Sequence, residues 1–138
     1  MIDESTEFGA RVARHLREDI VVWMTTVAPD GSPLPMPVWF HWDGGESVLM
    51  YSRRSVRVRN LEANPRVTLN FDGDGDGGDI VVLSGNAAIA DDAPAADQHR
   101  EYVRKYDGHI ARLDMTPETF AEVYNVPVRI ELDRLRGH

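Results

Sequence analysis

The stretch that decides the fold runs from Leu34 to Pro65 and reads LPMPVWFHWDGGESVLMYSRRSVRVRNLEANP. Its first half, from Pro37 to Trp42, is rich in aromatic and β-branched residues, which favour strands. The glycines of Asp43-Gly44-Gly45 supply the positive φ that a tight turn needs. We therefore expect Ser47 to Ser52 to return as a second strand. A short helix over Val56 to Ala63 follows, and the next Asn-Pro pair stops it.

The segment Ser52-Arg53-Arg54-Ser55, which joins the second strand to the helix, is a candidate anion site. Hydroxyls, guanidinium groups and free backbone N–H groups converge there, where the helix dipole is positive. Arg53 and Arg57 are four residues apart, so both can reach one phosphate. A solvated basic face on a surface helix explains the same charges, and charge alone favours neither interpretation.

Three segments of the chain show a resemblance to a known family that covers nearly the whole chain. They are VVWMTTVAPDGSPLPMPVWFHWDG, VLMYSRRSVRVRNLEANPRVTLNFDG and GGDIVVLSGNAAI. In this order they resemble the pyridoxamine 5'-phosphate oxidase-like split β-barrel superfamily, and within it the actinobacterial branch of flavin/deazaflavin oxidoreductases. The resemblance implies coenzyme F420 as the cofactor, with FMN as the alternative. It also implies hydride transfer to or from a small organic substrate, whose identity the sequence does not reveal.

In that family, a segment S-x-x-x-x-[KR]-x-x-N-L after the third strand binds the cofactor phosphate. This chain has Ser52, Arg57, Asn60 and Leu61 at those positions, with Arg57 where the family usually has Lys. The family also passes a proline-containing strand beside the cofactor ring. The implied cofactor-binding residues are Met36, Pro37, Val38, Trp39, Ser52, Arg53, Arg54, Ser55, Arg57 and Asn60.

Composition limits the classes of function. The 138 residues, 42% of them hydrophobic, suffice for one core, so we expect a single domain over residues 1–138. The net charge of −8 argues against a nucleic-acid or anionic-membrane partner. The chain has no cysteine, which removes disulfides, thiolate metal sites and a cysteine nucleophile. An acidic N-terminus and the lack of about 18 consecutive apolar residues predict a cytoplasmic protein.

The remaining chain predicts strands separated by helices. Apolar residues recur every four positions from Thr6 to Glu18, as in an amphipathic helix. A further helix is expected over Ala95 to Tyr106, and Thr116 should cap another that has proline at its first position. The expected strands are Ile20–Ala28, Leu34–Trp42, Ser47–Ser52, Arg66–Asp72, Asp79–Asp91 and Val126–Leu132. The prediction is a mainly β fold, a six-stranded antiparallel split β-barrel with peripheral helices.

Two details refine that barrel. Pro33, Pro35 and Pro37 remove alternate N–H donors, so their strand should lie at an edge or bend of the sheet. The run Ile80 to Leu83 is continuously apolar, as in strands buried on both faces. Arg134-Leu135-Arg136 is expected to leave the last strand as a basic tail.

The acidic run from Asp72 to Asp79 resembles part of a calcium loop. Asp72, Asp74, Asp76 and Gly77 match its positions 1, 3, 5 and 6, but position 12 is Leu83 rather than a bidentate glutamate. Strands rather than helices flank the run. We therefore interpret it as a flexible hairpin loop and predict no metal site.

Catalytic motifs are few. No glycine-rich nucleotide loop follows a strand, the five histidines show no metal spacing, and Leu83-Ser84-Gly85 lacks the first glycine of a nucleophile elbow. A cofactor-dependent redox enzyme needs little more than binding, orientation and exclusion of water. His41 and Tyr51 are candidate catalytic residues that protonate the substrate, although packing roles explain both. An FMN-dependent reductase or oxidase and a non-catalytic cofactor-binding protein stay open as alternatives.

The large apolar side chains also predict an oligomer. Trp23, Met24, Met36, Trp39 and Trp42 fall on alternating faces and exceed what one small barrel interior accepts. We expect a homodimer, and the resemblance implies two cofactor sites at its interface. The alternative is a monomer whose helices cover those faces.

Overall fold

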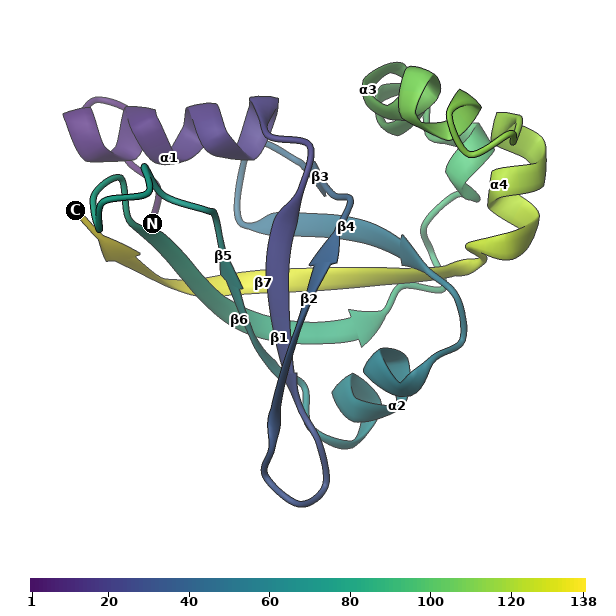
Figure 1. Ribbon diagram of the computed structural model, residues 1–138, viewed down its shortest axis with the longest axis horizontal. Helices are drawn as coiled ribbons and strands as arrows, with labels where there is room; N and C mark the ends of the chain where they lie inside the picture. Colours follow the sequence, from purple (N-terminus) through teal and green to yellow (C-terminus); the bar gives the residue numbers. More distant parts are fainter.

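A computed structural model describes residues 1–138, and its main element is one antiparallel sheet of seven strands in the order β2-β1-β5-β6-β7-β4-β3 (Figure 1). The strands are β1 (Val22–Val27), β2 (Pro33–Val38), β3 (His41–Trp42), β4 (Ser47–Ser52), β5 (Arg66–Asn70), β6 (Val81–Ile89) and β7 (Val126–Gly137). The helices are α1 (Glu7–Glu18), α2 (Val56–Ala63), the 3-10 turn η1 (Ala96–Gln98), α3 (Arg100–Ala111) and α4 (Pro117–Val123).

The sheet curls into a half-barrel, and the chain connectivity explains why. β2 and β3 stand at the two ends of the strand order, yet only Trp39 and Phe40 separate them in sequence. The three steps of chain from Val38 to His41 span no more than about 11 Å, so the two ends of the sheet must approach each other. The mainly β, antiparallel prediction is therefore confirmed.

The predicted number of six strands is wrong, because Leu34–Trp42 does not form one strand. Residues up to Val38 pair with β1, whereas His41 and Trp42 pair with β4. Between them, the Phe40 N–H donates to the hydroxyl of Tyr106 instead of to a neighbouring strand. The proline-rich half does lie at the sheet edge, as predicted from the missing N–H donors.

Three other features differ from the predictions. β7 continues to Gly137, so the expected basic tail is part of a strand that pairs with β6. Burial along β6 alternates from Val81 onward, so this run is not buried on both faces. The helix expected over Ala95 to Tyr106 is a 3-10 turn followed by α3.

Other local predictions are confirmed. The helix expected over Thr6 to Glu18 is α1, and Thr116 caps α4 with Pro117 at the first helical position. The helix α2 has the predicted bounds. These elements depend on contacts between residues within one turn of chain, so the local sequence is enough to predict them.

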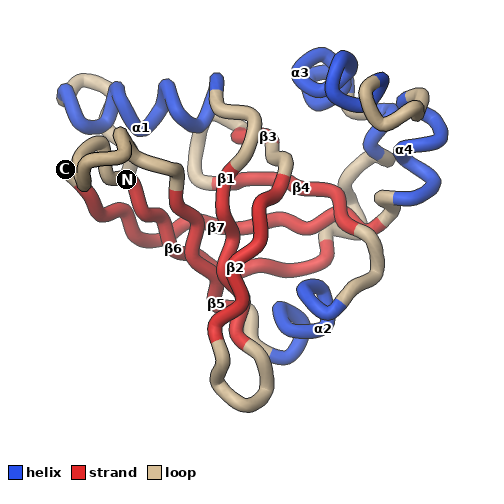
Figure 2. The backbone as a smooth tube through the Cα atoms, in the orientation of Figure 1, coloured by secondary structure: helices blue, strands red, loops and turns tan.

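Two apolar clusters hold the layers together. The first fills the concave side of the sheet, where α1 contributes Val12 and Leu16. The second lies between β4 and the helices α3 and α4, and includes Tyr51, Tyr102 and Phe120. Figure 2 shows α1 over one end of the sheet, with α3 and α4 together over the other and α2 on the opposite side. No helix is both long and apolar enough to cross a lipid bilayer.

Candidate functional site

A cavity of about 210 Å³ lies where the end of β2, the end of β4, α2 and the α3–α4 pair meet. It brings together six of the residues predicted for the site: Pro37, Val38, Trp39, Tyr51, Ser52 and Arg57. Its remaining lining residues are Met50, Tyr102, Leu113, Phe120 and Tyr124. Residues predicted from one stretch of sequence thus meet a second group from the two C-terminal helices.

The polar side of the cavity is the start of α2. Ser55 is the N-cap, but its side chain makes no capping hydrogen bond, and its buried Oγ has no partner. Arg57 lies in the first turn, and its Nε is also buried without a partner. Burial lowers the pKa of Arg57 from its usual value, although a guanidinium stays charged in proteins. Ser55 does not line the cavity, whereas Arg57 does. The site therefore holds a half-buried cation at the start of a helix whose first N–H groups are free, which suits an anion.

The apolar side of the cavity is a stack of rings. The ring of Trp39 lies 4.8 Å from that of Tyr106 at an interplanar angle of 10°, and 5.6 Å from that of Phe120 at 14°. The rings of Phe120 and Tyr124 are 4.4 Å apart. Nearly parallel rings at these distances cover one another's faces, so together they form a rigid apolar wall.

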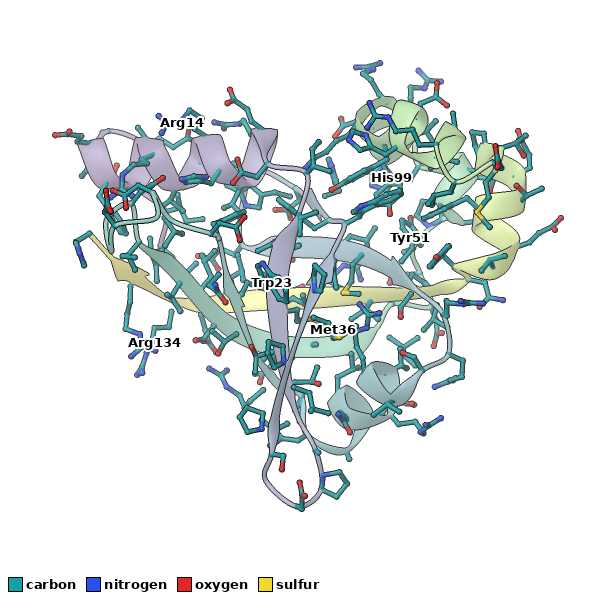
Figure 3. All side chains as sticks on the ribbon, viewed as in Figure 1. Arg14, Trp23, Met36, Tyr51, His99 and Arg134 are labelled. Atoms are coloured by element: carbon teal, nitrogen blue, oxygen red, sulfur yellow. The ribbon has the colours of Figure 1, made fainter.

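Other predicted residues lie outside the cavity. Met36 is 47% exposed on the edge strand β2, where Figure 3 shows it on the hairpin with Trp23. Arg54 forms an ion pair with Glu62 at 2.6 Å. The buried amide of Asn60 donates to Thr26 Oγ1 at 3.3 Å and thus joins α2 to β1.

Arg53 lies at the rim of the cavity. Its guanidinium carbon is 5.9 Å from the centroid of the Tyr124 ring, and Tyr124 lines the cavity. The side chain is exposed and forms no ion pair. An exposed cation at this position adds positive potential to the mouth of the cavity.

The two candidate proton donors are placed differently. Tyr51 lines the cavity, but its hydroxyl donates to the Pro94 carbonyl at 2.8 Å, and burial raises its pKa to about 12. His41 lines polar clefts outside this cavity, with its Nε2 3.1 Å from Glu101 and its ring 4.7 Å from that of His99. Burial lowers the pKa of His41.

The sequence reasoning did not assign the rings on α3 and α4 to the site. The helical spacing of Tyr102, Phe120 and Tyr124 does predict that these side chains face inward. What spacing does not show is that these helices pack on β4 beside Ser52. No group of three or more His, Asp or Glu side chains is arranged to hold a metal ion.

The family model described as pyridoxamine 5'-phosphate oxidase matches residues 8–129. No curated protein matches the chain.

Solved structures of three proteins share the fold. An F420 reductase is 22% identical with a TM-score of 0.65, and the match covers 88% of this chain and 92% of that one. A conserved hypothetical protein from Mycobacterium tuberculosis is 25% identical with a TM-score of 0.68, covering 95% and 82%. The heme storage protein HutZ from Vibrio cholerae is 13% identical with a TM-score of 0.64, covering 96% and 95%.

Proposed function

Because the chain belongs to the pyridoxamine 5'-phosphate oxidase family, we propose that it is an oxidoreductase that binds coenzyme F420. It transfers a hydride between this cofactor and a small organic substrate. The observation that carries the proposal is the buried, unpartnered Nε of Arg57 beside an apolar, ring-lined cavity. An F420 reductase among the proteins of the same fold supports the choice of cofactor.

The start of α2 suits a cofactor phosphate. A half-buried guanidinium without a carboxylate partner is poorly solvated, and a phosphate supplies both the opposite charge and acceptor oxygens. Ser52 lines the cavity together with Arg57, and the N–H groups of the first helical turn need acceptors. Arg57 and these N–H groups would hold the phosphate, with Arg53 adding charge at the rim.

The stack of rings suits the planar ring of the cofactor. Trp39 and Phe120, stacked on each other, form an apolar wall, and Pro37 and Val38 line the same cavity. When bound, F420 or FMN supplies the hydride chemistry. The chain's own residues orient the ring and exclude water from it.

We propose that a second copy of the chain completes the site. A cavity of about 210 Å³ is smaller than the roughly 300–1,000 Å³ that is usual for ligand sites. Leu34 and Met36 expose apolar side chains on the free edge of β2, next to residues that line the cavity. A homodimer packed across this edge would bury them and enclose the part of the ring that one subunit leaves uncovered.

Of the two predicted proton donors, Tyr51 is the one that lines the cavity, so we propose Tyr51 for protonation of the substrate. Its O–H must then give up the hydrogen bond to the Pro94 carbonyl and donate to the substrate instead. His41 lines polar clefts outside this cavity, where a role in this reaction would need the partner subunit.

Two alternatives share the same site. An FMN-dependent reductase or oxidase would use the same contacts, because FMN and F420 both carry a planar ring and a ribityl phosphate. A non-catalytic cofactor-binding protein is the second alternative. It has support from a heme storage protein of the same fold, 13% identical to this chain.

One titration series separates the three. Purified apoprotein is titrated with F420 and, separately, with FMN, and the cofactor fluorescence is recorded. Tighter binding of F420, followed by substrate-dependent oxidation of reduced F420, is the expected result. Preferential binding and turnover of FMN would favour the first alternative, and binding without turnover over a broad panel of acceptors would favour the second.

A further inference from the structure

Tyr102 carries a fully buried hydroxyl that has no hydrogen-bond partner. The side chain comes from α3 and is 0% exposed. Leaving such a group unpaired costs stability, and native structures keep very few of them. A buried hydroxyl without a partner is therefore an observation that needs a physical reason.

Packing holds this ring in place. The Tyr102 ring is 4.8 Å from that of Tyr51 at 77°, and 4.9 Å from that of Tyr106 at 41°. The ring of Phe120 is 6.2 Å away. These rings keep Tyr102 away from solvent, and no group of the protein accepts the proton of its hydroxyl.

The open space beside the ring is the cavity of the proposed cofactor site, which Tyr102 lines together with Arg57. Of the other hydroxyls on that wall, those of Tyr51 and Ser52 are already used, and that of Tyr124 belongs to a half-buried side chain. Tyr51 donates to the Pro94 carbonyl, and Ser52 donates to the Arg53 carbonyl at 2.8 Å. Tyr102 is therefore a buried hydroxyl of this wall with its proton still free to donate.

Charge in the cavity indicates what kind of group would accept that proton. Burial raises the pKa of Tyr102 well above its ordinary value, so the side chain stays a neutral phenol. The one charged lining residue is the cation Arg57. A ligand that presents acceptor atoms matches both residues, whereas a ligand that presents an ammonium group matches neither.

We propose that Tyr102 is a positioning residue, which donates its O–H to a carbonyl oxygen of the planar ring that fills the cavity. The inference rests on the proposed function, since it takes that ring to be the cofactor's. The pyrimidine ends of the FMN and F420 rings both carry carbonyl oxygens. Arg57 holds the phosphate end, and Tyr102 fixes the rotation of the ring about its own plane.

The test uses the full chain, two variants and two ligands. FMN and riboflavin differ only in the phosphate, and binding of each to wild type, Y102F and R57A is measured by fluorescence. Y102F should weaken both ligands by the same factor, about fivefold to thirtyfold. R57A should weaken FMN and leave riboflavin nearly unchanged. The absorption spectrum of bound FMN should also shift between wild type and Y102F, because the ring loses a hydrogen bond.

Stability without ligand is the second measurement. Removing an unpaired buried hydroxyl should leave the urea midpoint of Y102F equal to or above that of wild type. Unchanged affinity of Y102F for both ligands would overturn the inference, and so would a lowered urea midpoint with a loss confined to FMN. Failure of the proposed function looks different, because wild type itself would then bind neither F420 nor FMN.

Discussion

The hydroxyl of Tyr106 accepts the backbone N–H of Phe40 at 2.9 Å and donates to the carbonyl of Ile20 at 2.7 Å. Phe40 lies at the crossover between β2 and β3, where its N–H has no strand partner. Lys105 donates to the Phe40 carbonyl at 3.3 Å from the same helix. The helix α3 thus replaces the missing sheet contacts and fixes the crossover that carries Trp39 into the cavity.

Removal of this hydroxyl should destabilise the protein. Tyr106→Phe leaves the buried N–H of Phe40 and the carbonyl of Ile20 without their partner, at a cost of about 1–3 kcal/mol. Urea unfolding should show a lower midpoint with an unchanged slope. As a matched control, Tyr124→Phe removes a half-buried hydroxyl that makes no hydrogen bond and should change the unfolding free energy by less than about 0.5 kcal/mol. Equal effects of the two changes would contradict the role of the Phe40 contact.

Stability should depend on the protonation of His15. Its Nδ1 lies 2.7 Å from Asp19 and its Nε2 lies 2.9 Å from Asp79, which Arg11 also contacts. Burial lowers the pKa of His15, but the hydrogen bonds to Asp79 and Asp19 outweigh it, so the net shift is upward. The folded-state pKa therefore exceeds the unfolded value of about 6.5, and the protonated form stabilises the fold below that pH.

The stabilisation by His15 should disappear as the pH rises through its raised folded-state pKa. His15→Gln should then cost about 1 kcal/mol more at about pH 5.5 than at about pH 8.5, as measured by urea unfolding. Asp79 stays ionised at about pH 5.5, because the hydrogen bond from His15 lowers the pKa of its carboxyl group. Arg17→Gln breaks an exposed pair with Glu4 and should show no such difference. A pH-independent effect of His15→Gln would rule out the ion pairs as its cause.

Arg57 should control cofactor affinity and not folding. A charge-assisted hydrogen bond to phosphate is worth roughly 1.5–3 kcal/mol, so Arg57→Ala should weaken F420 or FMN binding by about tenfold to a hundredfold. The melting temperature of the apoprotein should barely move, because Nε has no partner to lose. Arg59→Ala, on the same helix but exposed, is the control. Unchanged affinity in Arg57→Ala would place the phosphate elsewhere.

Sedimentation at low micromolar concentration should show a species of twice the 15.5 kDa chain mass. Met36→Glu puts a charge on the exposed apolar edge of β2 and should weaken the dimer by at least roughly tenfold, since an unpaired buried charge costs several kcal/mol. Arg14→Glu, on the exposed face of α1 in Figure 3, should leave the dimer intact. A single species at the chain mass that still binds cofactor would exclude both the dimer and the shared site.

Local sequence by itself determined the elements and half of the cavity. The bounds of α2, the cap at Thr116 and the edge position of the proline-rich strand depend on neighbouring residues, so they could be predicted. Ser52 and Arg57 meet at the cavity because one turn of chain joins β4 to α2. These features arise from backbone preferences and side-chain contacts within a few positions.

Only the tertiary structure decided where the long strand breaks and which rings complete the cavity. Trp39 and His41 are two residues apart, so strand alternation would place them on one face. The break at Phe40 instead sends Trp39 into the cavity and His41 to a polar cleft. That break depends on Tyr106, 66 positions further along the chain. A contact between a helix side chain and a distant backbone leaves no periodic signal in the sequence, so the fold alone determines it.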